Sequence, residues 1–524
     1  MIQHRVVTSL MTGALLLTAS GFCVNVTVNS TQPEVPGSNY QTIGAALTYV
    51  KAQPAPHIVR ITGGGPYFEA AGIQIDYSLT MSGDGYKPVI VCGPTNTPNV
   101  SASNLNNGIY IFVPDTAPAD THIDVDFRNF IVIPDKTNPP INHGIRSNTD
   151  AAGLSPTATV NIAIQDVVVT ANDGSDNPVT MDGFTPTTAP AGIVRFGNRG
   201  LYFSGHINDL ATTRVISSWN IVDGAAYVSD SYAGRTLFNP VYVGPGCVFS
   251  YNGRNGVYFN SDGTPDMMMG TANEPIWIHN NRIEGVWANW QGALGIWHDD
   301  DNRPECTAVL NYVYVVNNNQ IAFFTGYVDA GESLPPVYAD HCFFTGNNGT
   351  GLYFSNELTV SYFMRDWLLT NCTFANNGLI PEASPRDMTG PLTVLAGALG
   401  GAATGTLTFQ DCILAGKGSA AAPGDNTLNI QDPLGVIVAY SGLVLAGPQL
   451  LSDAGFTLGS GVPTPVQIAV VNADPQFASM TDMKNPNYYG VQNAAYGGKG
   501  SGGTNLSGAG KYLGGSSVGE WSLF

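Results

Sequence analysis

The stretch that decides the fold is Cys247–Phe259, CVFSYNGRNGVYF, because it aligns without a gap to Cys342–Phe354, CFFTGNNGTGLYF. Less complete copies begin at Ile276, Val313 and Cys372. One asparagine is common to all five copies, at Asn252, Asn281, Asn318, Asn347 and Asn377. The intervals between these asparagines are 29, 37, 29 and 30 residues, so the repeat is nearly uniform and one copy carries an insertion.

This period, with short apolar runs, Asn-Gly turns and no helical spacing, indicates a β-solenoid. One coil cannot bury its apolar face alone, so neighbouring coils must stack into a continuous core. Helical repeats of similar length need amphipathic helices, which Asn- and Gly-rich segments do not favour. The sequence therefore predicts an all-β solenoid with Cys247, Ile276, Val313, Cys342 and Cys372 in one column.

The repeat resembles that of the right-handed parallel β-helix family, which includes pectate lyases and pectin methylesterases. Tyr40–Val50 is similar to the family's N-terminal capping helix, and His57–Ile75 is similar to its first strand and Gly-rich turn. Asp474–Phe477 looks like the closing motif of some bacterial members. The resemblance covers roughly residues 38–480 and implies a right-handed parallel β-helix with a capping helix. Its motifs specify the fold far better than the function.

The N-terminus has the parts of a signal peptide over residues 1–21. A basic start precedes the apolar run Val6–Thr18, and small residues follow at Ala19–Gly21. Lipid attachment at Cys23 is an alternative, although bulky Phe22 stands where that site needs a small residue. We expect a secreted or extracellular protein, with attachment to the cell surface left open.

The rest of the chain is expected to divide into a lead (22–38), the β-helix (39–480) and a Gly/Ser-rich tail (481–524). We expect residues 497–517 of the tail to be flexible or loosely packed. The chain has 524 residues, of which 43% are hydrophobic, so disorder is excluded. Its net charge of −19 offers no cationic surface for phosphate, which argues against nucleic-acid binding.

The cysteines follow the repeat. Cys247, Cys342, Cys372 and, by extension, Cys412 occupy one equivalent position, so we expect them to point inward as small hydrophobic side chains. Cys247 and Cys342 lie three coils apart, which is too far for a disulfide. Adjacent coils permit a disulfide between Cys342 and Cys372 or between Cys372 and Cys412.

Tryptophans are concentrated in one coil, at Trp277, Trp287, Trp290 and Trp297. Trp297 directly precedes His298–Arg303, HDDDNR. Indole rings stack on sugar rings, while carboxylates and arginine bond to hydroxyl groups. We therefore expect Gln291–Glu305 to protrude as a loop and to line a saccharide groove. The alternative is that two of the tryptophans pack in the core and the loop is a solvated turn.

An aromatic column is expected from the gapless alignment, at Tyr258, Trp287, Phe324 and Tyr353. The residues before them are mostly aliphatic: Val257, Val286, Phe323 and Leu352. Strand alternation sends the two sets to opposite faces, so an aliphatic core implies exposed rings about 4.8 Å apart. Such a ladder would bind a polysaccharide chain. The alternative is the reverse facing, with the aromatic rings stacked inside.

Acidic residues follow this strand in each copy, at Asp262, Asp266, Asp299, Asp300, Asp301, Asp329, Glu332 and Glu357. Stacked coils would align them into one ridge, where carboxylates could hold Ca²⁺ with Asp299 and Asp301 as ligands. The alternative is a solvated acidic face.

The candidate catalytic residues are Asp299, Asp300, Asp301 and Arg303. Asn148–Asp150 and Asp299–Asp300 match two motifs of the family's polygalacturonases, but they lie too many coils apart to share a substrate, and the Gly-His-Gly and Arg-Ile-Lys motifs are absent. Pectate lyases combine a Ca²⁺–carboxylate cluster with a basic residue, and Arg303 is the matching feature. A hydrolase needs two carboxyl groups about 5 to 9.5 Å apart, which Asp299–Asp301 with Asp329 or Glu357 could supply.

These features predict a protein that binds a polysaccharide or cell-surface glycan, with lyase or hydrolase activity left open. The expected binding residues are Tyr258, Trp287, Trp290, Trp297, His298, Phe324, Tyr353 and Glu357. The alternative is a structural surface protein, such as an adhesin, filament or appendage subunit, that associates with copies of itself without catalysis.

Overall fold

The computed structural model describes residues 24–63, 65–95, 106–114, 117–137, 141–148, 158–180, 182–184, 189–205, 207–228, 241–260, 266–282, 292–297, 307–319, 321–326, 333–334, 336–349, 351–355, 363–364, 367–377, 392–394, 405–415, 428–430, 436–441, 444–446, 476–498 and 504–514.

Within these residues the strands form three long, all-parallel sheets, which we call sheets A, B and C. Sheet A runs in the order β2 (Asn39–Tyr40), β1 (Val24–Val28), β3 (His57–Ile61), β6 (Leu79–Gly83), β9 (His122–Arg128), β12 (Thr159–Gln165), β15 (Ile207–Thr213), β18 (Val241–Val243), β21 (Asp266–Met269), β24 (Ala308–Asn311), β28 (Val337–Asp340), β32 (Trp367–Thr370), β35 (Gly405–Gln410) and β38 (Val436–Ser441).

Sheet B contains β4 (Tyr67–Glu69), β7 (Val89–Cys92), β10 (Ile131–Pro134), β13 (Val168–Val169), β16 (Ile216–Ser218), β19 (Val248–Ser250), β22 (Ile276–His279), β25 (Val313–Val316), β29 (Phe343–Thr345), β33 (Thr373–Ala375), β36 (Ile413–Ala415) and β39 (Val444–Ala446). Sheet C contains β5 (Ile73–Ile75), β8 (Asn107–Ile111), β11 (His143–Asn148), β14 (Arg199–Ser204), β17 (Ala225–Val228), β20 (Val257–Asn260), β23 (Gly292–Trp297), β26 (Ile321–Gly326) and β30 (Leu352–Ser355). Two small parallel pairs are β27 (Ser333–Leu334) with β31 (Phe363–Met364) and β34 (Leu392–Val394) with β37 (Leu428–Ile430).

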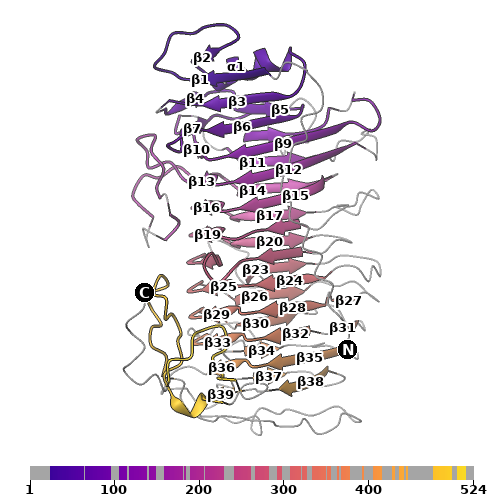
Figure 1. Ribbon diagram of the computed structural model, residues 1–524, viewed down its shortest axis with the longest axis vertical. Helices are drawn as coiled ribbons and strands as arrows, with labels where there is room; N and C mark the ends of the chain where they lie inside the picture. The colour runs from indigo at the N-terminus through magenta and orange to yellow at the C-terminus, as the bar shows by residue number, and fades with distance from the viewer. Residues whose placement is uncertain are drawn as a thin grey trace.

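The coils stack along one long axis, and from β4 to β30, apart from β27, successive strands pass through sheets A, B and C in turn (Figure 1). A connection between parallel strands of one sheet is right-handed in about 98% of cases, because twisted strands pack back onto the sheet only that way. The chain is a right-handed parallel β-helix, as the sequence predicts. The first strand of the described residues, β1, begins at Val24 and pairs with β3.

The N-terminal end of the core is covered by helix α1 (Ile43–Lys51) (Figure 1). Thr42 caps the helix by accepting a hydrogen bond from the Ala45 backbone N–H. The carboxylate of Glu69 accepts from the Ile43 and Gly44 backbone N–H groups, at 2.7 and 3.1 Å. The capping helix predicted from Tyr40–Val50 is confirmed. No helix in the described part of the chain is long and apolar enough to cross a membrane.

The predicted inward column is also confirmed. Ile276 pairs with Val313 in sheet B, and Cys247, Cys342 and Cys372 precede the equivalent strands. All of these side chains are buried. Cys92, Cys247, Cys342, Cys372 and Cys412 are free thiols, so neither permitted disulfide is formed.

The outer face of sheet B is largely apolar and is covered by the chain itself. Its outward column is Val168, Ile216, Val248, Trp277, Tyr314, Phe343, Thr373 and Ile413. Near β16 and β19, Val179, Ala189 and Ile193 pack against the rings of Trp219 and Tyr251. Further along the axis, the C-terminal segment lies beside the same face (Figure 1).

This C-terminal segment corrects the expectation of a loosely packed tail. Within 476–498 and 504–514, the buried side chains are Tyr488, Tyr489, Val491, Tyr496 and Leu506, which pack with Val316, Phe343, Ala375 and Ile413. The segment includes the short 3₁₀ helix η4 (Ala494–Tyr496). Within residues 497–517, where glycine and serine content predicted flexibility, Leu506 is buried and Ala509 and Tyr512 pack against the same cluster on sheet B.

The insertion was also placed wrongly. Gly292–Trp297 is a regular strand, β23, in which Ala293, Leu294 and Ile296 are buried. It therefore does not belong to a protruding loop. The rest of the predicted loop, through Glu305, lies outside the described residues. Because β23 starts at Gly292, the additional residues of this coil precede the strand.

Candidate functional site

Each coil from β16 to β33 turns from sheet B toward sheet C around one buried asparagine. These residues, the asparagine ladder, are Asn220, Asn252, Asn281, Asn318, Asn347 and Asn377. Asn252 donates hydrogen bonds from its backbone N and Nδ2 to Oδ1 of Asn281, both at 3.0 Å. Asn281 donates in the same way to Asn318. Since the buried amides bond to one another along the axis, the corner between sheets B and C keeps the same geometry from coil to coil.

Glycines on the sheet C side give the ladder its space. A Cβ atom at Gly224 would lie 2.7 Å from Nδ2 of Asn252, and one at Gly256 would lie 2.8 Å from Nδ2 of Asn281. Real Cβ atoms do not approach so closely, so these positions require glycine. Arg199, Asp223 and Asn255 stand directly before Gly200, Gly224 and Gly256.

A group of charged, amide and aromatic side chains lies on the outside of this corner. The arginine–tyrosine cluster, as we call it, consists of His143, Arg146, Arg199, Tyr202, Asp223, Arg254, Asn255 and Tyr258. Its members come from four successive coils, because β11, β14, β17 and β20 are neighbours in sheet C. Residues distant in sequence are thus brought within one or two coil rises of each other.

Asp223 is the centre of the cluster. Its carboxylate accepts from Arg199 Nε at 2.8 Å, from Arg254 Nε at 2.8 Å and from Arg254 Nη2 at 2.6 Å. The Asn255 backbone N–H also donates to it, at 3.2 Å. Burial would raise the pKa of Asp223, but Arg254 and Arg199 hold it below its ordinary value, so the carboxylate is ionised at neutral pH. A buried anion therefore positions both guanidinium groups.

Tyr202 is the aromatic centre of the cluster. The His143 ring stacks on it with centroids 4.9 Å apart, and the guanidinium carbons of Arg146 and Arg199 lie 5.0 and 4.7 Å from its centroid. Burial, together with the charges of Arg146 and Arg199, lowers the pKa of His143 well below its ordinary value, so this ring is neutral at pH 7. Tyr258 faces Arg254 in a similar contact, at 5.8 Å.

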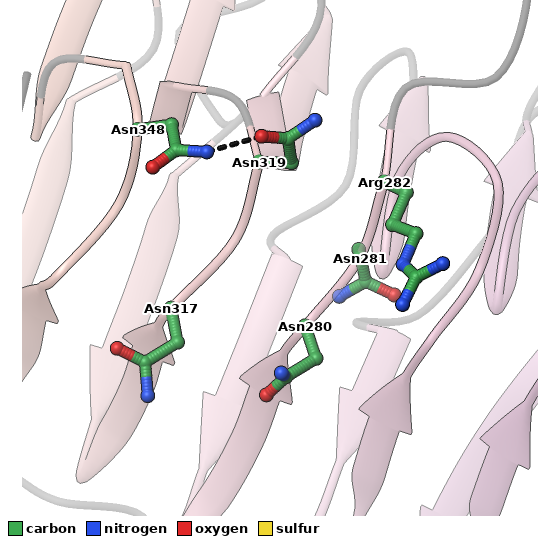
Figure 2. Close-up of a pocket in the computed structure, with 6 residues that line it drawn as sticks. All are labelled: Asn280, Asn281, Arg282, Asn317, Asn319 and Asn348. Atoms are coloured by element: carbon green, nitrogen blue, oxygen red, sulfur yellow. Dashed lines mark hydrogen bonds between the residues drawn. The ribbon is translucent and has the colours of Figure 1, made fainter. Parts of the chain in front are cut away.

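An amide-lined pocket follows along the same corner. Its volume is about 440 Å³, and its lining residues are Asn280, Asn281, Arg282, Asn317, Asn319 and Asn348 (Figure 2). Asn348 donates a hydrogen bond to Asn319 on the adjacent coil (Figure 2). Asn280 and Asn317 have positive φ at equivalent places after β22 and β25. Asparagine adopts this conformation more readily than most residues, which explains its recurrence there.

The cluster and the pocket follow one another along the axis. Arg282 N–H bonds to Asn252 O, Asn319 N–H to Asn281 O and Asn348 N–H to Asn318 O, so these three residues advance one coil at a time. The equivalent residue of the preceding coil is Gly253, whose N–H bonds to Asn220 O, and Arg254 of the cluster directly follows it. We call this succession of residues the corner track and define it by His143, Arg199, Asp223, Arg254, Arg282, Asn319 and Asn348. Seven coils at a rise of about 4.8 Å give it a length of roughly 29 Å.

The predicted aromatic ladder is only partly correct. Val257, Leu294, Phe323 and Leu352 pair in register and face the core, so the facing of the strand is confirmed. Between Tyr258 and Phe324, however, the paired residue is Gly295 and not Trp287, because the insertion precedes the strand. Tyr258 is half-buried, and Phe324 is only 1% exposed, so the exposure predicted for Phe324 is wrong.

Most other candidates fall outside what the structure describes. Trp287, Trp290, His298, Asp299, Asp300, Asp301, Arg303 and Glu357 are not among the described residues, and of Trp297 and Tyr353 only the backbone is described. Asp266, expected on an exposed acidic ridge, is a buried residue of β21 and is an exception to that ridge. The described residues contain no group of three potential metal ligands. The Ca²⁺ site at Asp299 and Asp301 stays a prediction.

Sequence reasoning missed the arginine–tyrosine cluster, although a signal for it was present. The four segments that form it share the order X-Gly-apolar-X: HGIR from His143, RGLY from Arg199, DGAA from Asp223 and NGVY from Asn255. Extending the repeat from NGVY toward the N-terminus would have aligned these four segments. The first and last residues of each segment are the ones that point outward.

Comparison with known proteins assigns this chain to no family. No protein-family model matches this chain, and no curated protein matches it. Among solved structures it is similar to the Dettilon tailspike protein gp208, with 10% identity, 83% of this chain and 68% of that chain covered, and a TM-score of 0.27. It is also similar to tailspike gp61 of Pseudomonas phage phi297, with 11% identity, coverages of 85% and 83%, and a TM-score of 0.22. At these values the fold assignment rests on the three parallel sheets of the chain itself.

Proposed function

We propose that this protein binds a polysaccharide along the corner track. The observation that carries the proposal is the succession of histidine, arginine, aspartate and asparagine residues that the corner track takes from seven successive coils, with Tyr202 and Tyr258 beside it. A straight polar row of roughly 29 Å suits an extended polymer of several sugar units better than a small, compact ligand.

The chemistry of the track supports the same ligand class. Asparagine amides both donate and accept hydrogen bonds, which matches the mixed character of sugar hydroxyl groups. Half-buried Tyr202 and Tyr258 offer ring surface to the apolar faces of sugars. Trp287 and Trp290 belong to the segment that continues directly from Arg282 of the pocket, and in this proposal they add further stacking surface.

The proposal is for binding, and cleavage is a separate prediction. Asp223 is the carboxylate of the track. It is unsuited to acid–base catalysis, because both of its oxygens accept hydrogen bonds from arginine. A lyase or hydrolase function would depend on Asp299–Asp301 and Arg303. The proposal includes export from the cytoplasm, for which the apolar run Val6–Thr18 is the support.

The test is a glycan array followed by titration of the best ligand with the full chain. Replacing Arg282 and Asn319 by alanine removes two pocket groups, and affinity should fall about tenfold or more. The matched control is Arg128→Ala, an exposed arginine on sheet A that pairs with Asp126. If the wild type binds no glycan, or if the double variant binds as well as Arg128→Ala, the proposal is wrong.

A second candidate, a structural subunit that associates with itself, is favoured by the outer face of sheet A. Tyr242, Met267, Val309, Tyr338 and Leu368 pair in register as an apolar stripe, in which Tyr338 is 44% exposed. Light scattering of the wild type and Tyr338→Glu tests it. An oligomer that the substitution dissociates supports this function, and a wild-type monomer at high concentration excludes it.

A further inference from the structure

We infer that the corner track selects a polysaccharide whose sugars carry an anionic substituent, and that Arg199 and Arg254 bind this group. The inference rests on the proposed glycan-binding function and specifies its ligand. Carboxylate, sulfate and phosphate groups all fit this description, because all three present oxygens to which a guanidinium group can donate in pairs.

The first support is charge. The whole chain has a net charge of −19 and only 20 lysines and arginines in 524 residues. The corner track holds Arg199, Arg254 and Arg282 against the single carboxylate of Asp223. With a neutral His143, its formal charge is therefore +2. The corner track is thus positively charged on a protein whose net charge is strongly negative, and an anionic ligand explains this difference.

The second support is the geometry around Asp223. Two guanidinium groups share one fully buried carboxylate, and their side chains are 18% and 20% exposed. The compensating anion thus lies beneath the arginines, while the surplus positive charge reaches the surface. An arginine pair held by a buried acid loses little side-chain entropy when it binds, which favours tight and oriented contact with an anion.

The third support is unused hydrogen-bonding capacity in the same place. Over the described residues, Nδ1 of His143 and both amide atoms of Asn255 have no hydrogen-bond partner, although both side chains are buried. Buried polar groups are normally paired, so each unpaired one calls for an explanation, such as a bound water or ion. His143 stacks on Tyr202, and the Asn255 backbone bonds to Asp223, so both belong to the cluster.

The test begins with the ligand, so that it does not depend on any variant folding. The wild-type chain is applied to an array holding neutral glycans and glycans with uronate, sialate, sulfate or phosphate groups. The best ligand is then titrated in native form and after carboxyl reduction, desulfation or dephosphorylation, whichever applies. We expect at least a tenfold loss of affinity on neutralisation, and weaker binding of the native ligand as salt is raised. The chemical treatment that abolishes binding identifies the anionic group.

A variant then locates the contact. Arg199→Gln should lose affinity for the anionic ligand while retaining its weaker affinity for the neutralised one, a pattern that general unfolding would not produce. Arg128→Gln serves as the control and should bind as the wild type does. Equal binding of the native and neutralised ligands overturns the inference and leaves glycan binding intact. Equal binding by Arg199→Gln and Arg128→Gln also overturns it. Absence of binding to every glycan overturns the proposed function itself.

Discussion

Asn281 and Arg282 are adjacent in the chain and both line the amide pocket, Asn281 from the inner, buried side of the corner and Arg282 from its outer side. Asn281 is fully buried and exchanges hydrogen bonds with the coils before and after it. Arg282 is half-buried and lines the amide pocket, and its backbone bonds to Asn252. The inner side of the corner therefore stabilises the stack, while the outer side is free to vary in chemistry from coil to coil. Substitutions on the two sides should separate stability from recognition.

The largest effect is expected from Asn281→Ala on the inner side. The backbone N and Nδ2 of Asn252 would lose their acceptor, and the bonds that Asn281 Nδ2 donates to Phe249 O and Asn318 Oδ1 would also be lost. Leaving buried donors unsatisfied costs about 1–3 kcal/mol each, so the free energy of unfolding should fall by roughly 3 kcal/mol or more. Urea denaturation measures it, with Asn319→Ala as the outer-side control. Equal midpoints for the two variants would contradict the division between inner and outer sides.

The next effect is a pH dependence at the end of a sheet B strand. His279 is buried and stacks on Phe184 at 4.8 Å, and burial lowers its pKa to about 4. The unfolded chain has an ordinary histidine pKa near 6.5 and binds the proton first, so stability is full above about pH 6.5 and falls as the pH drops toward 4. The loss is at most about 3 kcal/mol at 1.36 kcal/mol per pKa unit.

Denaturation of the wild type and His279→Gln at pH 7 and pH 4.5 isolates this contribution. The difference in stability between the two proteins should shrink, or change sign, at the lower pH. A constant difference would show that His279 does not titrate in this way. His143 is common to both proteins, so its own depressed pKa cancels in the comparison.

A smaller loss is expected from Gly256→Ala, which tests the space that the ladder occupies. The new Cβ would lie 2.4 Å from Ile278 Cγ2 and 2.8 Å from Asn281 Nδ2, and overpacking of this kind costs typically about 1–3 kcal/mol. The equivalent positions of the next two coils are Ala293 and Ala322, so Ala322→Gly is a matched control and should cost at most about 1 kcal/mol. Comparable stability of Gly256→Ala and the wild type would mean that the corner can accommodate the additional methyl group without strain.

The smallest effect on stability is expected from Arg282→Ala on the outer side. Its side chain is half-buried, and the backbone bond to Asn252 survives the substitution. The free energy of unfolding, measured by thermal denaturation, should fall by no more than about 0.5 kcal/mol, while the affinity for glycan weakens. A large loss of stability would place Arg282 among the structural residues of the corner and would sharpen the boundary between its two sides.

Sequence reasoning predicted the parts of the site that repeat and missed those that do not. The shared asparagines and the inward column were visible because stacking requires the same residue type in each coil. The strand β23 was misplaced because an alignment without gaps cannot tell where within a coil an insertion falls. The arginine–tyrosine cluster was missed because its members differ from coil to coil and lie as much as 115 residues apart, from His143 to Tyr258.

The sequence by itself determined the coil, its period, its shared asparagines and the side of each strand that faces the core, because these follow from local alternation and from repetition. Only the tertiary structure decided what lies on the outer faces. Alternation sends Phe324 outward but does not determine whether anything covers it, and it is buried. Composition marks residues 497–517 as flexible, yet Leu506, Ala509 and Tyr512 pack in the cluster on sheet B. Coverage depends on which distant segments fold back over a sheet, and that is a property of the assembled solenoid.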